Sequence, residues 1–364
     1  MMQRNALSVL MLLLCTFLLN GCSTGAYFWQ ASTGHLRVLA AAEDIDEVLS
    51  QPHISEKLRA QLRYVEEIRQ FSVDHLSLPD NRSYRTYADL NRAYAVWNVV
   101  ASQPDRLMLE TWCFPLLGCI SYKGFYSESS AMALADSLRK KGLDVAVLGV
   151  PAYSTLGFTP DPVLNTFVNY PAGELARLIF HELAHQVVYI ADDTMFNESF
   201  ATAVEELGVL AWLAQPGREA LTVQYETFDS RRSEFRQMLA VARNDLEAIY
   251  ENSNKLDKSQ VLKLKDLRFK QLLADYADLK QSWGGWDGYD RFMAVDLNNA
   301  KLGVSGLYTQ YVPAFKALYL LCDQNFPRFY SATRVLGEYS REQREKLLNE
   351  LQQGEPLSFD FDCS

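Results

Sequence analysis

The sequence predicts a predominantly helical α+β fold: a small sheet, two helices that carry histidines and carboxylates, and a long helical hairpin. Apolar residues recur at three-to-four spacing over most of the chain. Short β-branched and aromatic runs lie between residues 83 and 157, and residues 218–283 are charged and free of proline. The 364 residues, 48% of them hydrophobic, can bury one large core or two moderate ones, which excludes a disordered chain.

Near the N-terminus, Arg4 precedes an apolar run over residues 7–19. The sequence Leu19-Asn20-Gly21-Cys22 ends this run. The run matches the apolar region of a signal peptide and is shorter than the roughly 20 residues that span a bilayer. Its Leu-x-Gly-Cys ending resembles a bacterial lipobox, which implies that residues 1–21 are removed and that Cys22 is lipidated. An ordinary cleaved secretory signal and an uncleaved anchor are the alternatives.

The residues that follow the anchor indicate where in the cell the protein lies, and the net charge indicates which partners it can bind. Residues 22–33 are expected to form a lipidated tether, and Ser23 follows the cysteine where an inner-membrane signal would place Asp. An exported protein anchored to the outer membrane and facing the periplasm is therefore expected in a Gram-negative bacterium. The net charge of −10 gives no general attraction for phosphate backbones, so a nucleic-acid partner is not expected.

Four cysteines remain outside the signal and the lipid site, and an even number in an exported protein indicates disulfides. Cys113 and Cys119 bracket a segment with turn-forming residues, so we expect them to pair and to leave Cys322 with Cys363. A zinc knuckle is the alternative, but the closer cysteine spacing that it needs is absent.

The first half of the mature chain contains helices and then strands. Residues 34–73 alternate apolar and charged positions and predict two amphipathic helices. Residues 83–126 are rich in aromatic and β-branched residues and predict strands. Residues 144–150 and 151–157 predict two further strands with a bend at Pro151.

The middle of the chain predicts two helices joined by a short turn. The first runs from Ala172 to Ile190, with Asn169 as a possible cap and Pro171 in the first turn. The second begins after Asp192-Asp193-Thr194.

Residues 218–283 predict a helical hairpin broken near Asn252-Ser-Asn-Lys and ended by Gly284-Gly285. The simplest interpretation of its charged residues is that they lie on solvent-exposed faces of the two helices. The last 75 residues are again aromatic and compact. The mature chain is predicted to have three parts. Residues 34–217 contain the N-terminal helices, the strands and the two central helices, and residues 218–290 form the hairpin. Residues 291–364 form a C-terminal helical part that closes a catalytic cleft.

The segment His181-Glu182-Leu183-Ala184-His185 lies inside the first of these central helices. Histidines at i and i+4 project from one helix face, so two imidazoles can bind one metal ion while Glu182 reaches a water molecule beside it. The alternative is a buried structural pair, which would be difficult to satisfy on an apolar helix face without a ligand.

A third metal ligand is expected from the second helix. Glu198 lies far enough after His185 for the chain to turn and return beside the first helix. Glu205, two turns further on nearly the same face, could orient a histidine through its other ring nitrogen, whereas Glu206 points elsewhere. The alternative is that Glu198 binds no metal and is simply a carboxylate near a helix N-terminus, where the helix dipole favours negative charge.

The pair of motifs HELAH and NESFATAVE resembles the gluzincin pattern and is similar to that of the large zinc aminopeptidase family, with a shorter spacing. The mature chain more closely resembles a bacterial group of exported putative aminopeptidases. The resemblance is carried by the two zinc motifs and by Gln30-Ala31-x-x-Gly34-His35, Cys113 to Cys119, Tyr122-Lys-Gly-Phe-Tyr126, Ala152 to Gly157, Asn298-Asn-Ala and Val312-Pro-Ala-Phe315. The Gly-x-Met-Glu-Asn motif of the large family, whose Glu holds the substrate's amine, is absent.

The resemblance implies a zincin-like metallopeptidase core with one Zn²⁺ held by His181, His185 and Glu198. It also implies that the segment before the first zinc helix is an edge strand that binds peptide through its backbone, here Ala152, Tyr153, Ser154, Thr155 and Gly157. Tyr308 is the candidate donor to the oxyanion, and Tyr311 is nearly as plausible.

The predicted function is a zinc-dependent peptidase of the periplasm that acts by Glu182-assisted attack of a zinc-bound water. The residues do not separate an endopeptidase from an aminopeptidase, and the aminopeptidase activity is implied by the resemblance. The expected partners are a peptide substrate and the membrane, through Cys22. The alternative is a lipid-anchored, non-catalytic binding or assembly protein that retains a structural zinc site.

Overall fold

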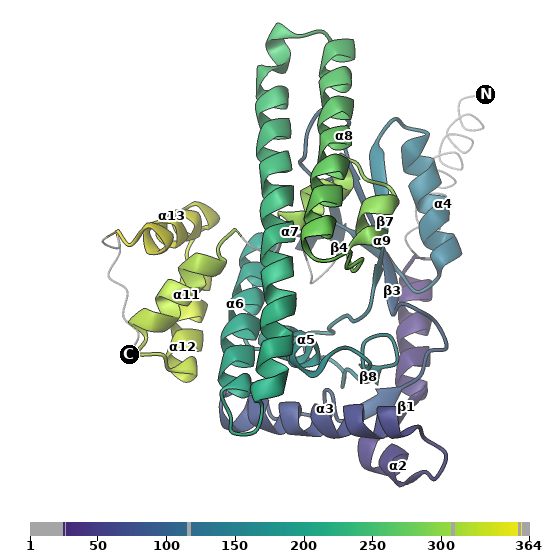
Figure 1. Cartoon of the computed structure of the whole chain (residues 1–364), viewed down its shortest axis with the longest axis vertical. Helices are drawn as coiled ribbons and strands as arrows, with labels where there is room; N and C mark the ends of the chain where they lie inside the picture. The colour runs from purple at the N-terminus through teal and green to yellow at the C-terminus, as the bar shows by residue number, and fades with distance from the viewer. Residues whose placement is uncertain (1–24, 26, 115–117, 307–309, 356–357, 359–364) are drawn as a thin grey trace, which may run out of the picture.

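The computed structural model describes residues 25, 27–114, 118–306, 310–355 and 358, and it is mostly helical with small sheets (Figure 1). A helical hairpin follows the long axis of the molecule. The helices over residues 312–353 lie on one side of the hairpin, and the strands over residues 96–102 and 144–150 lie on the other. The predicted mainly helical α+β fold is therefore confirmed.

The described strands form sheets with the orders β1-β2-β8, β6-β3-β7 and β4-β5. The longest pairing is antiparallel and joins β3 to β7, from Val96 opposite Val150 to Ser102 opposite Asp144. Helix α4 (Glu128–Arg139), capped by Ser127, packs on this sheet. The strands are β1 (Ala42–Asp44), β2 (Thr86–Ala88), β3 (Val96–Ser102), β4 (Trp112–Phe114), β5 (Gly118–Ile120), β6 (Lys123–Phe125), β7 (Asp144–Val150) and β8 (Val163–Leu164).

The N-terminal part contains a helix over residues 27–40, then α2 (Ile45–Ser50) and α3 (Glu56–Asp74). The second of the two predicted helices corresponds to α3. The first begins earlier than expected and ends before β1. Ser55 caps α3, whose apolar face buries Leu62, Val65 and Ile68 in the largest core.

Helices α5 (Ala172–Ala184) and α6 (Thr194–Leu213) pack against each other in the middle of that core. Phe180 of α5, Phe200 of α6 and Phe315 of α11 (Val312–Leu321) are all fully buried there. Gly208 permits this close approach, because a Cβ atom at that position would lie 2.9 Å from the Phe180 ring.

The hairpin consists of α7 (Glu219–Glu251), a 3₁₀ turn (Asn252–Lys255) and α8 (Lys258–Ser282), as predicted. Its own core includes Leu239, Leu246 and Leu272. A buried ion pair between Lys265 Nζ and Asp144 Oδ2, 2.5 Å apart, ties α8 to the start of β7. The hairpin is thereby fastened to the sheet.

The C-terminal part is helical. Its helices are α9 (Asp290–Ala294), α10 (Asn299–Ser305), α11, α12 (Phe326–Glu338) and α13 (Arg341–Gln353). Helix α10 packs on β3 and β7, whereas α11 packs on α6 and α13.

The prediction of a strand over residues 151–157 is wrong. The segment Ala152 to Gly157 is a loop, and Thr155 is held by its backbone N–H bond to Asp161 Oδ2 at 3.0 Å. Leu156 and Gly157 both have positive φ angles, which break an extended strand. The loop is thus folded around the Asp161 carboxylate.

Helix α5 begins where predicted but ends earlier than predicted. It begins at Ala172 with Pro171 at the N-cap position, so Asn169 is not the cap. It ends at Ala184, and further along the chain the side-chain amide of Asn197 holds the backbone of Ile190 at both its N–H and its C=O, at 2.8 and 2.7 Å. Ile190 is therefore held outside the helix.

The disulfide between Cys113 and Cys119 is formed, as predicted, and closes the β4-β5 hairpin. Cys322 is also disulfide-bonded, but its predicted partner Cys363 lies outside the described residues, as does Cys22. Within the described ranges, none of the helices is long and apolar enough to cross a membrane.

Candidate metal centre

Two consecutive helices place three potential metal ligands together. His181 and His185 lie one turn apart at the end of α5, whose other faces are buried by apolar side chains. Asp193 caps α6 by accepting a bond from the Phe196 N–H at 3.2 Å. Because α6 begins there and packs along α5, Glu198 faces the two histidines.

The distances within this group fit one metal ion. The Nε2 atoms of His181 and His185 are 3.2 Å apart, and Glu198 Oε2 lies 3.3 Å from the first and 3.9 Å from the second. Ligands on a tetrahedral zinc ion at about 2.0–2.2 Å are themselves separated by about 3.3–3.5 Å. The predicted convergence of these side chains is observed, and the group could hold a metal ion.

The electrostatics favour the ligand forms of these side chains. Burial lowers the pKa of His185 to about 4, so its imidazole is neutral at physiological pH. Burial alone would raise the pKa of Glu198, but the hydrogen bond with His181 and the charges of both histidines bring it below its usual value. Neutral imidazoles beside an ionised carboxylate are the states in which these groups bind zinc.

Glu182 lies between the two histidines in the sequence and is partly exposed. Burial raises its pKa to about 7, with His181 opposing the rise and the carboxylates of Glu198 and Asp161 adding to it. A carboxylate with a pKa near neutrality is suited to accept a proton and to release it again.

Glu205 lies beside the Nδ1 atom of His181. Its Oε2 lies 3.0 Å from His181 Nδ1, in a contact whose angle falls short of a good hydrogen bond. Arg177, only 7% exposed, forms an ion pair with the same carboxylate. Such a carboxylate fixes the orientation of a metal-binding imidazole and raises its basicity.

We expect Glu205→Gln to weaken zinc binding about 10- to 100-fold, the range typical of changes behind a ligating histidine. The amide keeps the shape of the side chain but lacks the charge that His181 faces. Competition with a fluorescent chelator measures the affinity. The matched control is Glu206→Gln in the same helix, because Glu206 pairs with Lys316 at 2.6 Å and Arg236 at 3.3 Å. An equal effect of both substitutions would contradict the assignment.

A chain of charges continues from Arg177 to the hairpin. Arg177 lies 3.6 Å from Glu174 Oε2, and Arg232 on α7 donates to the same oxygen at 2.7 Å. Arg232 also pairs with Asp229 at 2.9 Å. The hairpin helix therefore belongs to the support of the metal centre, which its high charge density alone did not suggest.

Of the two predicted tyrosine donors, the structure describes only Tyr311. Tyr308 lies outside the described residues, and Tyr311 is buried in the large core at 5% exposure. The structure instead places Tyr122, which follows β5, near the metal group. Burial raises the pKa of Tyr122 most, followed by the charge of Glu198, with that of Glu182 also contributing.

A large cavity of about 910 Å³ opens beside the start of α6, and none of the metal-group residues lines it. It is lined by Ser121, which precedes Tyr122, and by Thr194 and Met195 from the first turn of α6. Cys119 also lines it, and its backbone N–H donates to Asp192 at 2.6 Å. The cavity has room for several peptide residues.

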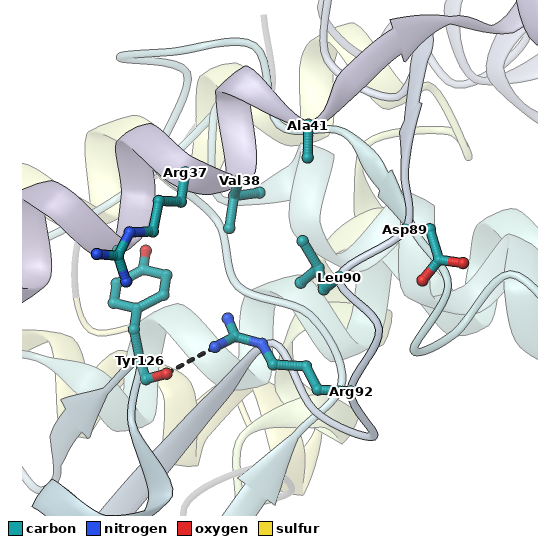
Figure 2. A pocket seen from close by; sticks show the side chains of 8 residues that line it. Arg37, Val38, Ala41, Asp89, Leu90, Arg92 and Tyr126 are labelled. Carbon is teal, nitrogen blue, oxygen red and sulfur yellow. Dashed lines mark hydrogen bonds between the residues drawn. The ribbon is translucent and has the colours of Figure 1, made fainter.

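The loop over residues 152–157 lies beside the turn after His185, since a Cβ atom on Gly157 would touch the Gln186 side chain at 3.4 Å. Tyr153 in this loop bonds to His35 Nδ1 at 2.9 Å and packs edge-on against Tyr126. Tyr126 also lines a smaller cavity with Arg37 and Arg92, in which Arg92 donates to the Tyr126 carbonyl (Figure 2). None of the metal-group residues lines that cavity.

Two further residues near Glu182 were not singled out from the sequence. Asp161, in the loop before β8, is 2% exposed, and burial raises its pKa to about 6. Tyr84, before β2, is 1% exposed, and burial raises the pKa of its phenol well above the usual value, with the charges of Glu182 and Asp161 adding to the rise. Neither lies in a recognisable motif.

Replacing Asp161 with Asn is expected to stabilise the metal-free protein at pH 7.5 by about 1–3 kcal/mol, because a buried carboxylate with a raised pKa is costly when ionised. The native carboxyl holds its proton more tightly than the unfolded one, so its contribution is favourable below pH 3.8 and is lost as the pH rises through about 6.

Urea unfolding at pH 7.5 and pH 4.5, with a chelator present, measures this effect, which should shrink at the lower pH. Asp80→Asn serves as the control, because Asp80 is an exposed partner of Arg85. A clear loss of stability in Asp161→Asn at pH 7.5 would contradict the expectation.

The comparisons with known proteins support one family. The sequence model of a family described as "Putative aminopeptidase" matches residues 26–348. No curated protein and no solved structure matches the chain.

Proposed function

The chain belongs to the putative aminopeptidase family, and on this premise we propose that it is a zinc-dependent peptidase that removes N-terminal residues from peptides. Family membership implies a hydrolase with a peptide substrate. The observation that carries the proposal is the convergence of His181, His185 and Glu198, with Glu182 on the same helix as the histidines. The α5-α6 pair beside the strands serves as a zincin-like core.

Each side chain of the site has a separate role in the proposed hydrolysis. His181, His185 and Glu198 would hold a zinc ion, which would supply Lewis acidity at the scissile carbonyl and at the attacking water. Glu182 accepts the proton of the attacking water and passes it to the leaving amine. Tyr122, on whose phenol the charge of Glu198 acts, is a second candidate beside Tyr308 to donate a hydrogen bond to the negatively charged oxygen that develops on the carbonyl.

Product analysis tests this function. The zinc-loaded protein is incubated with a mixture of unblocked peptides, and the products are followed over time by mass spectrometry. Stepwise release of single N-terminal residues is expected. Internal cleavage would indicate an endopeptidase, and intact peptides after prolonged incubation would contradict the proposed function. The alternative of a non-catalytic binding protein gains no specific support, because a structural zinc site does not require Glu182.

We also propose that the protein is exported and held at the outer membrane, facing the periplasm, by acyl chains on Cys22. The lipobox-like sequence supports this location. In that case Cys22→Ser should move the protein from the membrane fraction to the soluble periplasmic fraction. An unchanged distribution between the fractions would contradict the anchor.

A further inference from the structure

Two buried polar atoms on segments that contact Gln186, the residue after His185, have no hydrogen-bond partner. One is the hydroxyl of Tyr84, a side chain that is 1% exposed, and the other is Oδ1 of Asp161, which is 2% exposed. Buried polar atoms are nearly always paired with protein or water, and leaving them unpaired is unfavourable. Two such atoms in one place indicate a group that the free chain does not supply.

The backbone holds both residues firmly in place. The Tyr84 N–H donates to the backbone carbonyl of Asp161 at 2.7 Å, and Tyr84 has a positive φ of 61°, which a bulky residue rarely adopts. Asp161 Oδ2 accepts from the Thr155 N–H at 3.0 Å and from Ser154 Oγ at 3.4 Å. One carboxylate oxygen is therefore used to organise the loop, and the other remains available.

The charges at this place are not compensated. Among the residues that the structure covers, no lysine or arginine forms an ion pair with Asp161 or Glu182. Arg69, whose charge acts on Tyr84, donates its hydrogen bonds to backbone carbonyls, to Ser72 and to Asn81. A positive charge beside Asp161 would compensate its buried carboxylate.

We propose that Asp161 and Tyr84 form the binding site for the free α-ammonium group of the peptide substrate. The inference rests on the proposed peptidase function, because this ammonium is the positive charge that every aminopeptidase substrate carries next to its scissile bond. Asp161 Oδ1 accepts one ammonium N–H and the Tyr84 hydroxyl oxygen accepts another, which uses both unpaired atoms.

This assignment explains how the site would select an exopeptidase substrate. An acylated N-terminus, or a bond inside a longer peptide, presents an uncharged amide to Asp161 and leaves the carboxylate uncompensated. Ser154, which donates to Asp161 Oδ2, is partly exposed, so the substrate can approach from its side. The loop over residues 152–157 contributes by holding Asp161.

Binding without turnover provides the first test. Zinc-loaded Glu182→Gln protein is titrated calorimetrically with trialanine and with N-acetyl-trialanine. The free-amine peptide is expected to bind about 10- to 100-fold more tightly, the effect of one hydrogen-bonded charge pair. When Asp161→Asn is added to this protein, the difference in affinity between the two peptides should disappear. Adding Tyr84→Phe should reduce the difference, and adding Asp80→Asn should leave it unchanged. Equal affinities in the parent protein, or a preference that survives Asp161→Asn, would overturn the proposal.

Hydrolysis provides the second test and separates this inference from the proposed function. In the otherwise native protein, Asp161→Asn should lower kcat/KM for unblocked peptides about 100-fold and change that for N-acetylated peptides less than about threefold. An equal loss for both classes would make Asp161 merely structural and overturn the amine site. The peptidase itself would still stand if the native protein cleaves peptides and Glu182→Gln does not.

Discussion

Replacing Glu182 with Gln is expected to lower kcat/KM for peptide hydrolysis at least about 1,000-fold while the zinc content stays at one ion per chain. General acid-base catalysis typically contributes about 10²–10⁴-fold, and Gln cannot accept the proton of the attacking water. The zinc content should not change, because Glu182 is not one of the three converging ligands.

The control for this substitution is Glu206→Gln, whose side chain pairs with Lys316 and Arg236 rather than facing the metal group. Steady-state kinetics and atomic absorption on the same preparations give both quantities. Normal turnover by a clean Glu182→Gln preparation would remove Glu182 from the reaction. A loss of zinc together with activity would instead make it a ligand or a structural residue.

Removal of a ligand is expected to have the second large effect. His185→Ala leaves two of the three converging atoms, so zinc affinity should fall by more than the roughly 100-fold seen when a group behind a ligand is changed. Peptide hydrolysis should then be undetectable at equimolar zinc. His185 is only 8% exposed, so the circular dichroism spectrum and the urea midpoint of the metal-free variant establish that it still folds.

Two companion variants make this result interpretable. Glu198→Gln removes the third ligand without creating a cavity and should lose zinc in the same way. His53→Ala changes an exposed histidine outside the site and should bind zinc normally. Retention of stoichiometric zinc by both ligand variants would show that the ion is held elsewhere.

The parts of the site that the sequence predicted depend on spacing within one or two helices. His181 and His185 lie on one face because residues four apart in a helix always do. Glu198 could be anticipated because a short turn brings the next helix back beside the first. The hairpin was recognisable for the same local reason, since its apolar positions follow the helical repeat over a long stretch without proline.

The parts that the sequence did not predict depend on contacts between distant segments. Tyr84 and Asp161 are separated by 77 positions and meet only because the Tyr84 N–H bonds to the Asp161 carbonyl. Residues 152–157 have the composition of a strand, yet the carboxylate of Asp161 binds Thr155 and folds them into a loop. In this place a tertiary contact outweighs local β-propensity.

The support behind His181 illustrates the same limit. The position of Glu205 could be predicted from its spacing of two turns after Glu198. The roles of Arg177 and Arg232 could not be predicted from the sequence. Arg232 lies on the hairpin and reaches the site through Glu174, across a boundary at which the sequence suggested a separate part of the chain. Charge density alone does not reveal which charges on a helix are solvated and which are paired.

The central claim is that one zinc ion on His181, His185 and Glu198 supports peptide hydrolysis. Its most direct test is a titration of the metal-free protein with zinc, in which the rate of cleavage of an unblocked peptide is measured after each addition. The rate is expected to rise from the background in proportion to added zinc and to level off at one equivalent per chain. A rate that is absent at every zinc concentration, or independent of zinc, would contradict the claim.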